Sequence, residues 1–271
     1  MFGFQPDPIL LQIGPLTLRW YGLLVVGGAL LAAMVDARLA ERWGDDPEHI
    51  WNALLWVLGL GIVMARLQFV LTSAMESAQM RAYYLSNPVH IIATWQGGIG
   101  IYGGLIGGVL GLALYTRRAG IPFWRWANWV IVGVPLAQAI GRWGNFFNQE
   151  LYGAPTSVPW AVTIDAAHRL PGYEAFSTFH PVFLYESLWN AIGFGILFWL
   201  AWRYGDRLLD GELLGLYLIW YPLGRFWVEF VRLGSTYVGG LSLAQWASLA
   251  TIAAAASVTA YRRARRRGAS L

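Results

Sequence analysis

The chain has 271 residues, of which 57 % are hydrophobic and 13 % are charged, with a net charge of +4. A soluble domain carries about 25 % charged residues, so the composition excludes an ordinary soluble protein and predicts a membrane protein with several spans. All 19 basic residues are arginines, and there is no cysteine, which excludes disulfides, thiolate nucleophiles and cysteine-bound metals.

Seven hydrophobic stretches predict an all-α polytopic membrane protein, and no linker divides the 271 residues, so we expect a single transmembrane bundle. The first stretch lacks a preceding basic region and a cleavage site, so we interpret it as a retained span and not as a signal peptide. The predicted spans cover about residues 16–39, 50–71, 96–116, 126–140, 180–202, 213–228 and 241–261.

The third span is rich in glycine and contains repeated small-xxx-small spacings, which predict a face where two helices pack closely. Tyr102 is a polar exception within this span. The glycine pairs are Gly100/Gly104, Gly103/Gly107, Gly104/Gly108 and Gly107/Gly111.

Two of the polar segments between the predicted spans are long. The stretch 72–95 is expected to be a simple connection, whereas 142–179 is rich in Pro, Gly and Thr and predicts a small cap of irregular or short-strand structure. Twelve arginines lie at one set of span ends and seven at the other. By the positive-inside rule the C-terminus is cytoplasmic, and the N-terminus and the cap are extracytoplasmic.

The positive-inside rule does not explain the arginines on the outer side. An arginine at the centre of a span costs at least about 2.5 kcal/mol unless it is paired or hydrated, so such residues are functional candidates. Several tyrosines and one histidine also fall at this depth, which predicts a site on the external face. These residues are Arg19, Arg66, Arg142, Arg225, Arg232, Tyr21, Tyr102, His180, Tyr185 and Tyr221.

Arginines with few carboxylates nearby are suited to an anion, because the guanidinium fork matches phosphate oxygens. Tyr221, Arg225 and Glu229 follow i, i+4, i+8 spacing and form one helical stripe. The structural alternative is an Arg225–Glu229 ion pair, and for Arg142 it is a side chain that reaches to interfacial water. Asn145 and Asn148 could bind glycerol hydroxyls or ester carbonyls, or cap a helix end.

Other enzyme signatures are missing from the sequence. His180 precedes a proline and is more often a helix-start residue than a base, and the histidines lack metal-ligand spacing, so we expect no metal and no cofactor. There is no G-x-S-x-G, H-E-x-x-H or repeated Asp cluster. The pattern favours metal-free chemistry on a phosphorylated lipid at the outer leaflet.

The segment GRWGNFFNQELYG (141–153) resembles the signature of the bacterial prolipoprotein diacylglyceryl transferases. The resemblance extends to WYGL, GGIGIYGGLIGG, HPVFLYE and RFWVEFVR, in order over most of the chain. It implies transfer of an sn-1,2-diacylglyceryl group from phosphatidylglycerol to the lipobox cysteine of a prolipoprotein, with release of glycerol 1-phosphate. The implied partners are these two substrates and the lipid bilayer of the bacterial inner membrane, with no nucleic acid.

The resemblance also assigns residues. Arg142 and Arg225 match the family's essential arginines, which implies phosphate binding and leaving-group stabilisation. Matches to other important positions are Asn145, Glu150, Gly153, Tyr21 and Tyr221, and we add Arg66, Asn148, His180, Glu229 and Arg232 as candidate substrate-binding residues.

Two positions depart from the family pattern. Tyr102 stands where some members have a histidine proposed as the base. Either Tyr102 is a base activated by a neighbour, or it only orients the lipid. Asn128 stands where some members have Asp, so no role for that carboxylate is carried over.

Two alternatives remain, a non-enzymatic function and proteolysis. A seven-span transporter or receptor for an anionic lipid would use the same arginines without turnover. Transporters, however, usually place polar residues near the midplane of the bilayer and contain an internal repeat. An intramembrane protease would need a Ser–His or paired Asp arrangement, which the sequence does not suggest.

Overall fold

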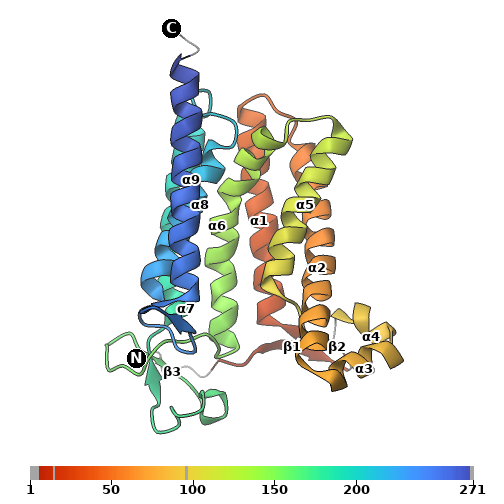
Figure 1. The fold of residues 1–271 in the computed structure, drawn as a ribbon, viewed down its shortest axis with the longest axis vertical. Coiled ribbons are helices and arrows are strands. Elements are labelled where there is room, and N and C mark those ends of the chain that lie inside the picture. The colour runs from red at the N-terminus through yellow and green to blue at the C-terminus, as the bar shows by residue number, and fades with distance from the viewer. Residues whose placement is uncertain (1–5, 15, 95–96, 269–271) are drawn as a thin grey trace. The chain divides into compact units, whose positions relative to one another are not determined.

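The structure, a computed structural model, describes residues 6–14, 16–94 and 97–268 and is mainly helical (Figure 1). One long helix coincides with each predicted span. These helices are α1 (Trp20–Arg42), α2 (Glu48–Glu76), α5 (Ile101–Ala119), α6 (Phe123–Phe147), α7 (Val182–Tyr204), α8 (Glu212–Val228) and α9 (Leu243–Gly268). Within the described residues, four of them, α1, α2, α7 and α9, are long and apolar enough to cross a membrane.

Short helices and strands lie before and between the long helices, and only those of the segment 142–179 were predicted. The stretch 72–95 is more than a connection, because α2 runs on to Glu76 and is followed by α3 (Ala78–Ser86) and α4 (Val89–Ile92). The Ser77 hydroxyl caps α3 by accepting from the Met80 amide at 3.3 Å. Three antiparallel pairs are formed by β1 (Ile9–Ile13) with β2 (Leu16–Arg19), β3 (Val162–Thr163) with β4 (Thr178–Phe179), and β5 (Tyr237–Val238) with β6 (Leu241–Ser242).

The chain divides into two compact units. One comprises Met1–Leu39 with Asn128–Leu271, and the other comprises Ala40–Ala127. The expectation of a single bundle stays a prediction.

In the Ala40–Ala127 unit, α5 packs against α2 through its glycines. A Cβ atom on Gly103, Gly107 or Gly111 would collide with α2 backbone, at Met64, Leu60 and Trp56 respectively. The side chain of Gln68 also accepts from the Gly103 amide at 2.7 Å. The predicted packing face is therefore confirmed, and backbone-to-backbone approach is the reason why glycine is required there.

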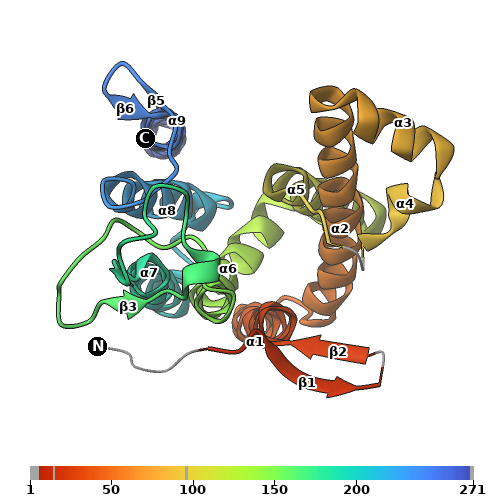
Figure 2. The same ribbon diagram turned by 90° about the horizontal axis from the view of Figure 1, so that it is seen from below.

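In the other unit, α7 and α8 pack side by side through two tryptophans (Figure 2). Trp189 donates its indole N–H to the Trp220 carbonyl at 3.0 Å, and Trp220 donates to the Trp189 carbonyl at 3.1 Å. The rings stack with centroids 4.3 Å apart. Each indole occupies the space where a Cβ would lie on a glycine of the opposite helix, Gly224 for Trp189 and Gly193 for Trp220. This reciprocal contact fixes the register of the two helices.

The side chain of Asn128 makes two structural hydrogen bonds. Its side-chain NH₂ donates to the Leu209 carbonyl at 2.9 Å, and its oxygen accepts from the Leu213 amide at 3.0 Å. The carboxamide thus closes the loop that leads into α8 and satisfies an amide in the first turn of that helix. An ionised aspartate could accept but not donate.

The irregular part of the predicted cap begins after α6. Helix α6 continues to Phe147, so Arg142 and Asn145 lie on the helix and not in irregular structure, and the cap as a domain of residues 142–179 stays a prediction. From residue 148 to 181 the chain is irregular, apart from β3, β4 and the 3-10 helix η2 (Ala166–His168). This part agrees with the predicted irregular and short-strand structure. An apolar cluster holds it onto α6 and α7, formed by Phe146, Tyr152, Val162, Ile164, Phe179 and Phe183.

Candidate active site

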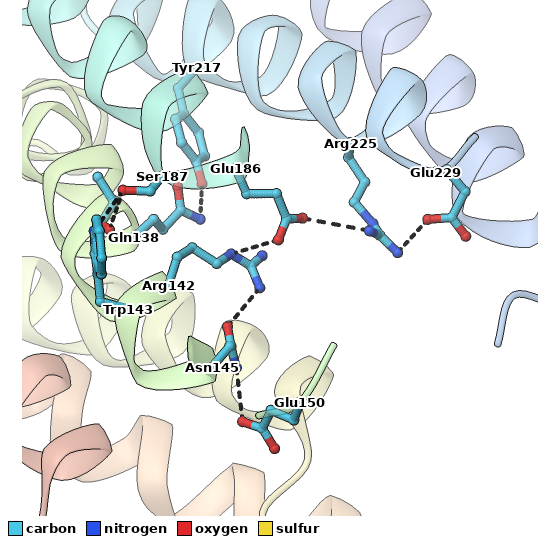
Figure 3. A network of polar contacts seen from close by, with 11 residues as sticks. Gln138, Arg142, Trp143, Asn145, Glu150, Glu186, Ser187, Tyr217, Arg225 and Glu229 are labelled. Carbon is cyan, nitrogen blue, oxygen red and sulfur yellow. Dashed lines mark hydrogen bonds and ion pairs between the residues drawn. The ribbon is translucent and has the colours of Figure 1, made fainter. Parts of the chain in front are cut away.

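A line of alternating charges joins α6, α7 and the end of α8 (Figure 3). Arg142 Nε lies 3.0 Å from Glu186 Oε2, and Arg225 Nη1 lies 3.6 Å from Glu186 Oε1. Arg225 Nη2 in turn lies 2.6 Å from Glu229 Oε2. The two arginines that the sequence singled out are therefore brought together, and a single carboxylate holds both.

Glu186 is the residue that sequence reasoning missed. Its side chain is 7 % exposed and sits between the two guanidinium groups. The available signal was its position one turn into an apolar helix, where a carboxylate needs a charged partner. It closes the HPVFLYE segment, but it was not selected as a site residue.

The expectation of few carboxylates near the arginines is wrong. Glu186 and Glu229 both contact them, and Glu229 is only 2 % exposed. The predicted Arg225–Glu229 ion pair is present at i, i+4 spacing, and the second Glu229 oxygen accepts from the Ser235 hydroxyl. Burial makes these contacts stronger than surface ion pairs, because water screens them less.

The guanidinium groups keep donor capacity for a ligand. Arg225 Nη1 is buried and has no hydrogen-bond partner among the described residues, since its approach to Glu186 is too long for a directed bond. Arg142 Nη1 reaches Asn145 Oδ1 only at 3.5 Å. Two fixed guanidiniums with incompletely used donors are suited to an anion with several oxygens.

The carboxamides of the signature surround Glu150. Asn145 Nδ2 donates to Glu150 Oε1 at 2.9 Å, and Asn148 Nδ2 donates to the same oxygen at 3.2 Å. Asn145 thereby connects Arg142 to Glu150, as Figure 3 shows. The two amides therefore hold the carboxylate of Glu150 in place.

The backbone around Glu150 adopts an unusual conformation. Gln149 and Leu151 have φ values of 51° and 57°, in the left-handed region that costs non-glycine residues about 1 kcal/mol or more. Gln149 is held there by Asp165: its side chain donates to the Asp165 carboxylate and accepts from the Asp165 amide, both at 2.7 Å. The cap therefore fixes the turn that presents Glu150.

Tyr21 reaches the same region from α1. Its ring packs over Gly144, where a Cβ would collide with it, and the preceding Trp20 stacks on Phe147 with centroids 4.7 Å apart. The start of α1 thus lies against the end of α6, which carries Arg142.

Gly153 has a backbone role. Its amide donates to the His180 carbonyl at 2.9 Å, and it bridges to Arg232, while a Cβ would strike the Val231 carbonyl. The backbone of Gly153 therefore holds the backbone of both predicted residues, His180 and Arg232. The His180 ring lies 3.0 Å from the Tyr185 hydroxyl.

Arg232 belongs to the same charged group. Burial lowers the pKa of its guanidinium, and the nearby positive charge of Arg225 lowers it further, whereas Glu186 and Glu229 raise it. A guanidinium pKa starts so high that Arg232 remains charged at neutral pH.

A narrow pocket lies between α7 and α8 beside these charges. It contains Tyr221, whose ring stacks on Tyr217 with centroids 5.8 Å apart. The pocket is lined by Glu186, Trp189, Asn190, Tyr221, Gly224, Arg225 and Val228. Of the predicted stripe, Tyr221 and Arg225 line this pocket, and Arg225 and Glu229 belong to the line of charges.

A protein-family model described as prolipoprotein diacylglyceryl transferase matches residues 8–261. The chain belongs to this family. Relatives named phosphatidylglycerol–prolipoprotein diacylglyceryl transferase include one from Synechococcus elongatus, 44 % identical over 253 residues that cover 92 % of this chain and 85 % of the relative. The relative from Chloroflexus aggregans is 43 % identical over 252 residues, 87 % of this chain and 80 % of its own. That from a Nostoc species is 41 % identical over 252 residues, 92 % and 87 % of the two chains.

This member of the prolipoprotein diacylglyceryl transferase family carries two further predicted residues in its Ala40–Ala127 unit. Arg66 is buried, and its guanidinium donates to the carbonyls of His90, Ile91, Gly97 and Gly98, with lengths of 3.0, 2.7 and 2.8 Å for the last three. Tyr102 lies in the first turn of α5, with 70 % of its surface exposed. Arg66 is thus engaged by backbone, whereas Tyr102 presents its ring outward.

Membership of this family does not support the alternative of a transporter or receptor for an anionic lipid. It supports the sequence interpretation of a transferase.

Proposed function

We propose that the protein transfers the sn-1,2-diacylglyceryl group of phosphatidylglycerol to the lipobox cysteine of a prolipoprotein, the first step of lipoprotein maturation. The family match and the names of the relatives support the reaction class. The observation that carries the residue assignment is the chain Arg142–Glu186–Arg225–Glu229, which holds two guanidiniums at a fixed spacing.

The arginines bind the phosphodiester. Glu186 and Glu229 hold them in place through part of each guanidinium, and the remaining donors meet the phosphate oxygens. Because the donors are fixed before the substrate enters, little reorganisation is needed when charge develops on the leaving group. Arg232 adds positive charge beside them.

The reaction is a displacement at carbon. The cysteine sulfur attacks the glyceryl carbon that carries the phosphate, a C–S bond forms, and the C–O bond breaks with its electron pair going to the phosphate. The thiol proton ends on the released glycerol 1-phosphate, whose second pKa is about 6. Arg142 and Arg225 stabilise the developing phosphate charge, an effect typically of about 3–4 kcal/mol per well-placed donor.

The other predicted residues form the walls of the site. Asn145 and Asn148 hold Glu150 beside Arg142, and Tyr21 and Tyr221 orient the lipid from α1 and α8. Gly153 and His180 fix the segment that carries Arg232. Tyr102 is assigned the role of orienting the lipid and not that of a base.

The topology completes the proposal. All seven long helices span the inner membrane of a bacterium, with the N-terminus and the cap extracytoplasmic and the C-terminus cytoplasmic. The arginine-rich end of α9 supports this orientation by the positive-inside rule. The site then faces the outer leaflet, where exported precursors emerge.

The test is incubation with phosphatidylglycerol and a lipobox peptide, followed by mass spectrometry of the peptide cysteine. We expect a mass gain of one diacylglyceryl group, and a loss of about 10²–10³-fold in rate for Arg142→Ala or Arg225→Ala. Arg81→Ala, at an exposed arginine of α3, is the matched control and should keep the wild-type rate. Near-normal transfer by either site variant would contradict the phosphate assignment.

A further inference from the structure

The pocket between α7 and α8 contains polar atoms that the protein does not satisfy. Asn190 Oδ1 and Arg225 Nη1 are both buried and have no hydrogen-bond partner among the described residues. Both residues line this pocket together with Glu186, whose Oε2 is already paired with Arg142 Nε at 3.0 Å. Two such atoms beside one pocket are unusual, since an unsatisfied buried polar group costs about 1–3 kcal/mol.

Asn190 is the less expected of the two. It is 1 % exposed in the middle of α7, four residues after Glu186, so both side chains lie on one face of the helix. Unlike Glu186, it has no part in the line of charges. A carboxamide buried in a membrane span without a partner for its oxygen points to a ligand that donates a hydrogen bond.

The donor and acceptor pattern narrows the ligand. The oxygen of Asn190 accepts a hydrogen bond, and the free N–H group of Arg225 donates one. The phosphate and the two ester groups of phosphatidylglycerol only accept. The head-group glycerol hydroxyls donate and accept, so they alone on this lipid complement both atoms.

The size and place of the pocket agree with a hydroxyl group. The free space between the side chains is that of about one water molecule. Arg225 lines the pocket and also belongs to the proposed phosphate site, and in phosphatidylglycerol the nearest head-group hydroxyl is two carbons from the phosphate oxygen.

We propose that this pocket is a subsite for a head-group hydroxyl of phosphatidylglycerol, with Asn190 Oδ1 accepting its hydrogen bond and Arg225 Nη1 donating to its oxygen. The inference rests on the proposed function and deepens it, because it makes Asn190 a determinant of head-group specificity. A site that hydrogen-bonds a substrate hydroxyl discriminates strongly against the analogue that lacks it, since its own polar groups are then left unpaired.

The experiment compares transfer from phosphatidylglycerol and from phosphatidylpropanol, which has the same length but neither hydroxyl. We expect the wild-type protein to prefer phosphatidylglycerol by about 10–100-fold in kcat/KM. Asn190→Leu, of similar volume, should reduce this preference about tenfold and leave the rate with phosphatidylpropanol nearly unchanged. Gln138→Leu is the matched control, because Gln138 is a half-buried carboxamide that bonds Tyr217 and does not line the pocket, so its ratio should equal that of the wild type.

Equal use of the two lipids by the wild-type protein would overturn the inference without any variant. An unchanged ratio in folded Asn190→Leu and Asn190→Ala would also overturn it and would leave a bound water only. Equal losses with both lipids would do the same, because the role of Asn190 would then be general. Transfer from neither lipid by the wild-type protein would instead contradict the proposed function, so the two failures are distinguishable.

Discussion

Both compact units contain arginines that are buried or half-buried, and these arginines have different partners. Arg66 of α2 donates to four backbone carbonyls of the segment that precedes α5. Arg142 and Arg225 instead meet carboxylates, and donors are left over. A guanidinium has five N–H donors, so Arg66 is nearly saturated by the protein itself, whereas the other two are not.

This difference separates two roles that look alike in a sequence. All three arginines interrupt apolar helices, and the cost of an arginine in a span marks each as functional. The hydrogen-bond and ion-pair partners of each arginine separate the two roles. Backbone carbonyls hold Arg66 in the loop that precedes α5, whereas carboxylates orient Arg142 and Arg225, the two arginines that we propose bind the phosphate.

The largest expected effect tests the Arg66 side of the comparison. Arg66→Met leaves four carbonyls without their donor and should lower the free energy of unfolding by about 3 kcal/mol or more. Thermal denaturation in detergent measures this, with Arg81→Met at an exposed position as the control. The folded fraction should keep its transfer rate. Wild-type stability with lost transfer would place Arg66 in the lipid site after all.

An intermediate effect is expected from Glu186→Gln. The neutral carboxamide presents an NH₂ group to one of the two guanidiniums, so the arginines lose their common anchor, and kcat should fall about 10–100-fold. KM for phosphatidylglycerol should fall or stay constant, because a competing carboxylate is gone. Steady-state kinetics separate the two constants.

Glu174→Gln, at an exposed carboxylate of the cap, is the control for that experiment. A rise in KM with constant kcat would mean that Glu186 acts in binding only and does not position the arginines.

The smallest effect concerns Tyr102. Tyr102→Phe keeps the ring and removes the hydroxyl from a largely exposed side chain, so stability should stay the same and kcat/KM should fall about 2–5-fold through the loss of one hydrogen bond to the lipid. Full retention of activity would exclude any role for the hydroxyl. A loss of about 10³-fold would favour the base over the orienting role.

The sequence predicted the helices well, because long apolar runs and glycine spacing are strong local signals. It also selected Arg142 and Arg225, since charges in apolar stretches are conspicuous. It missed the role of Glu186, because a bridge between α6, α7 and α8 depends on tertiary packing that no local pattern encodes.

Other features were beyond the sequence for related reasons. Arg66 and Arg142 both lie in apolar stretches, and only the structure shows that Arg66 meets backbone carbonyls whereas Arg142 meets a carboxylate. Helix α6 continues beyond the predicted end of its span because its last turn, although polar, packs against Trp20 and Tyr21. The pocket at Asn190 was identified from buried polar atoms without hydrogen-bond partners, and a sequence does not show which atoms have partners.

The exchange of indoles between α7 and α8 has a practical consequence. Both helices carry the same five-residue pattern, Trp-x-x-x-Gly, at 189–193 and 220–224, and each tryptophan occupies the gap left by the other helix's glycine. The contact needs no third element and satisfies both indole N–H groups with main-chain carbonyls. The pattern is therefore a compact module that designers could transplant to lock two antiparallel membrane helices in one alignment.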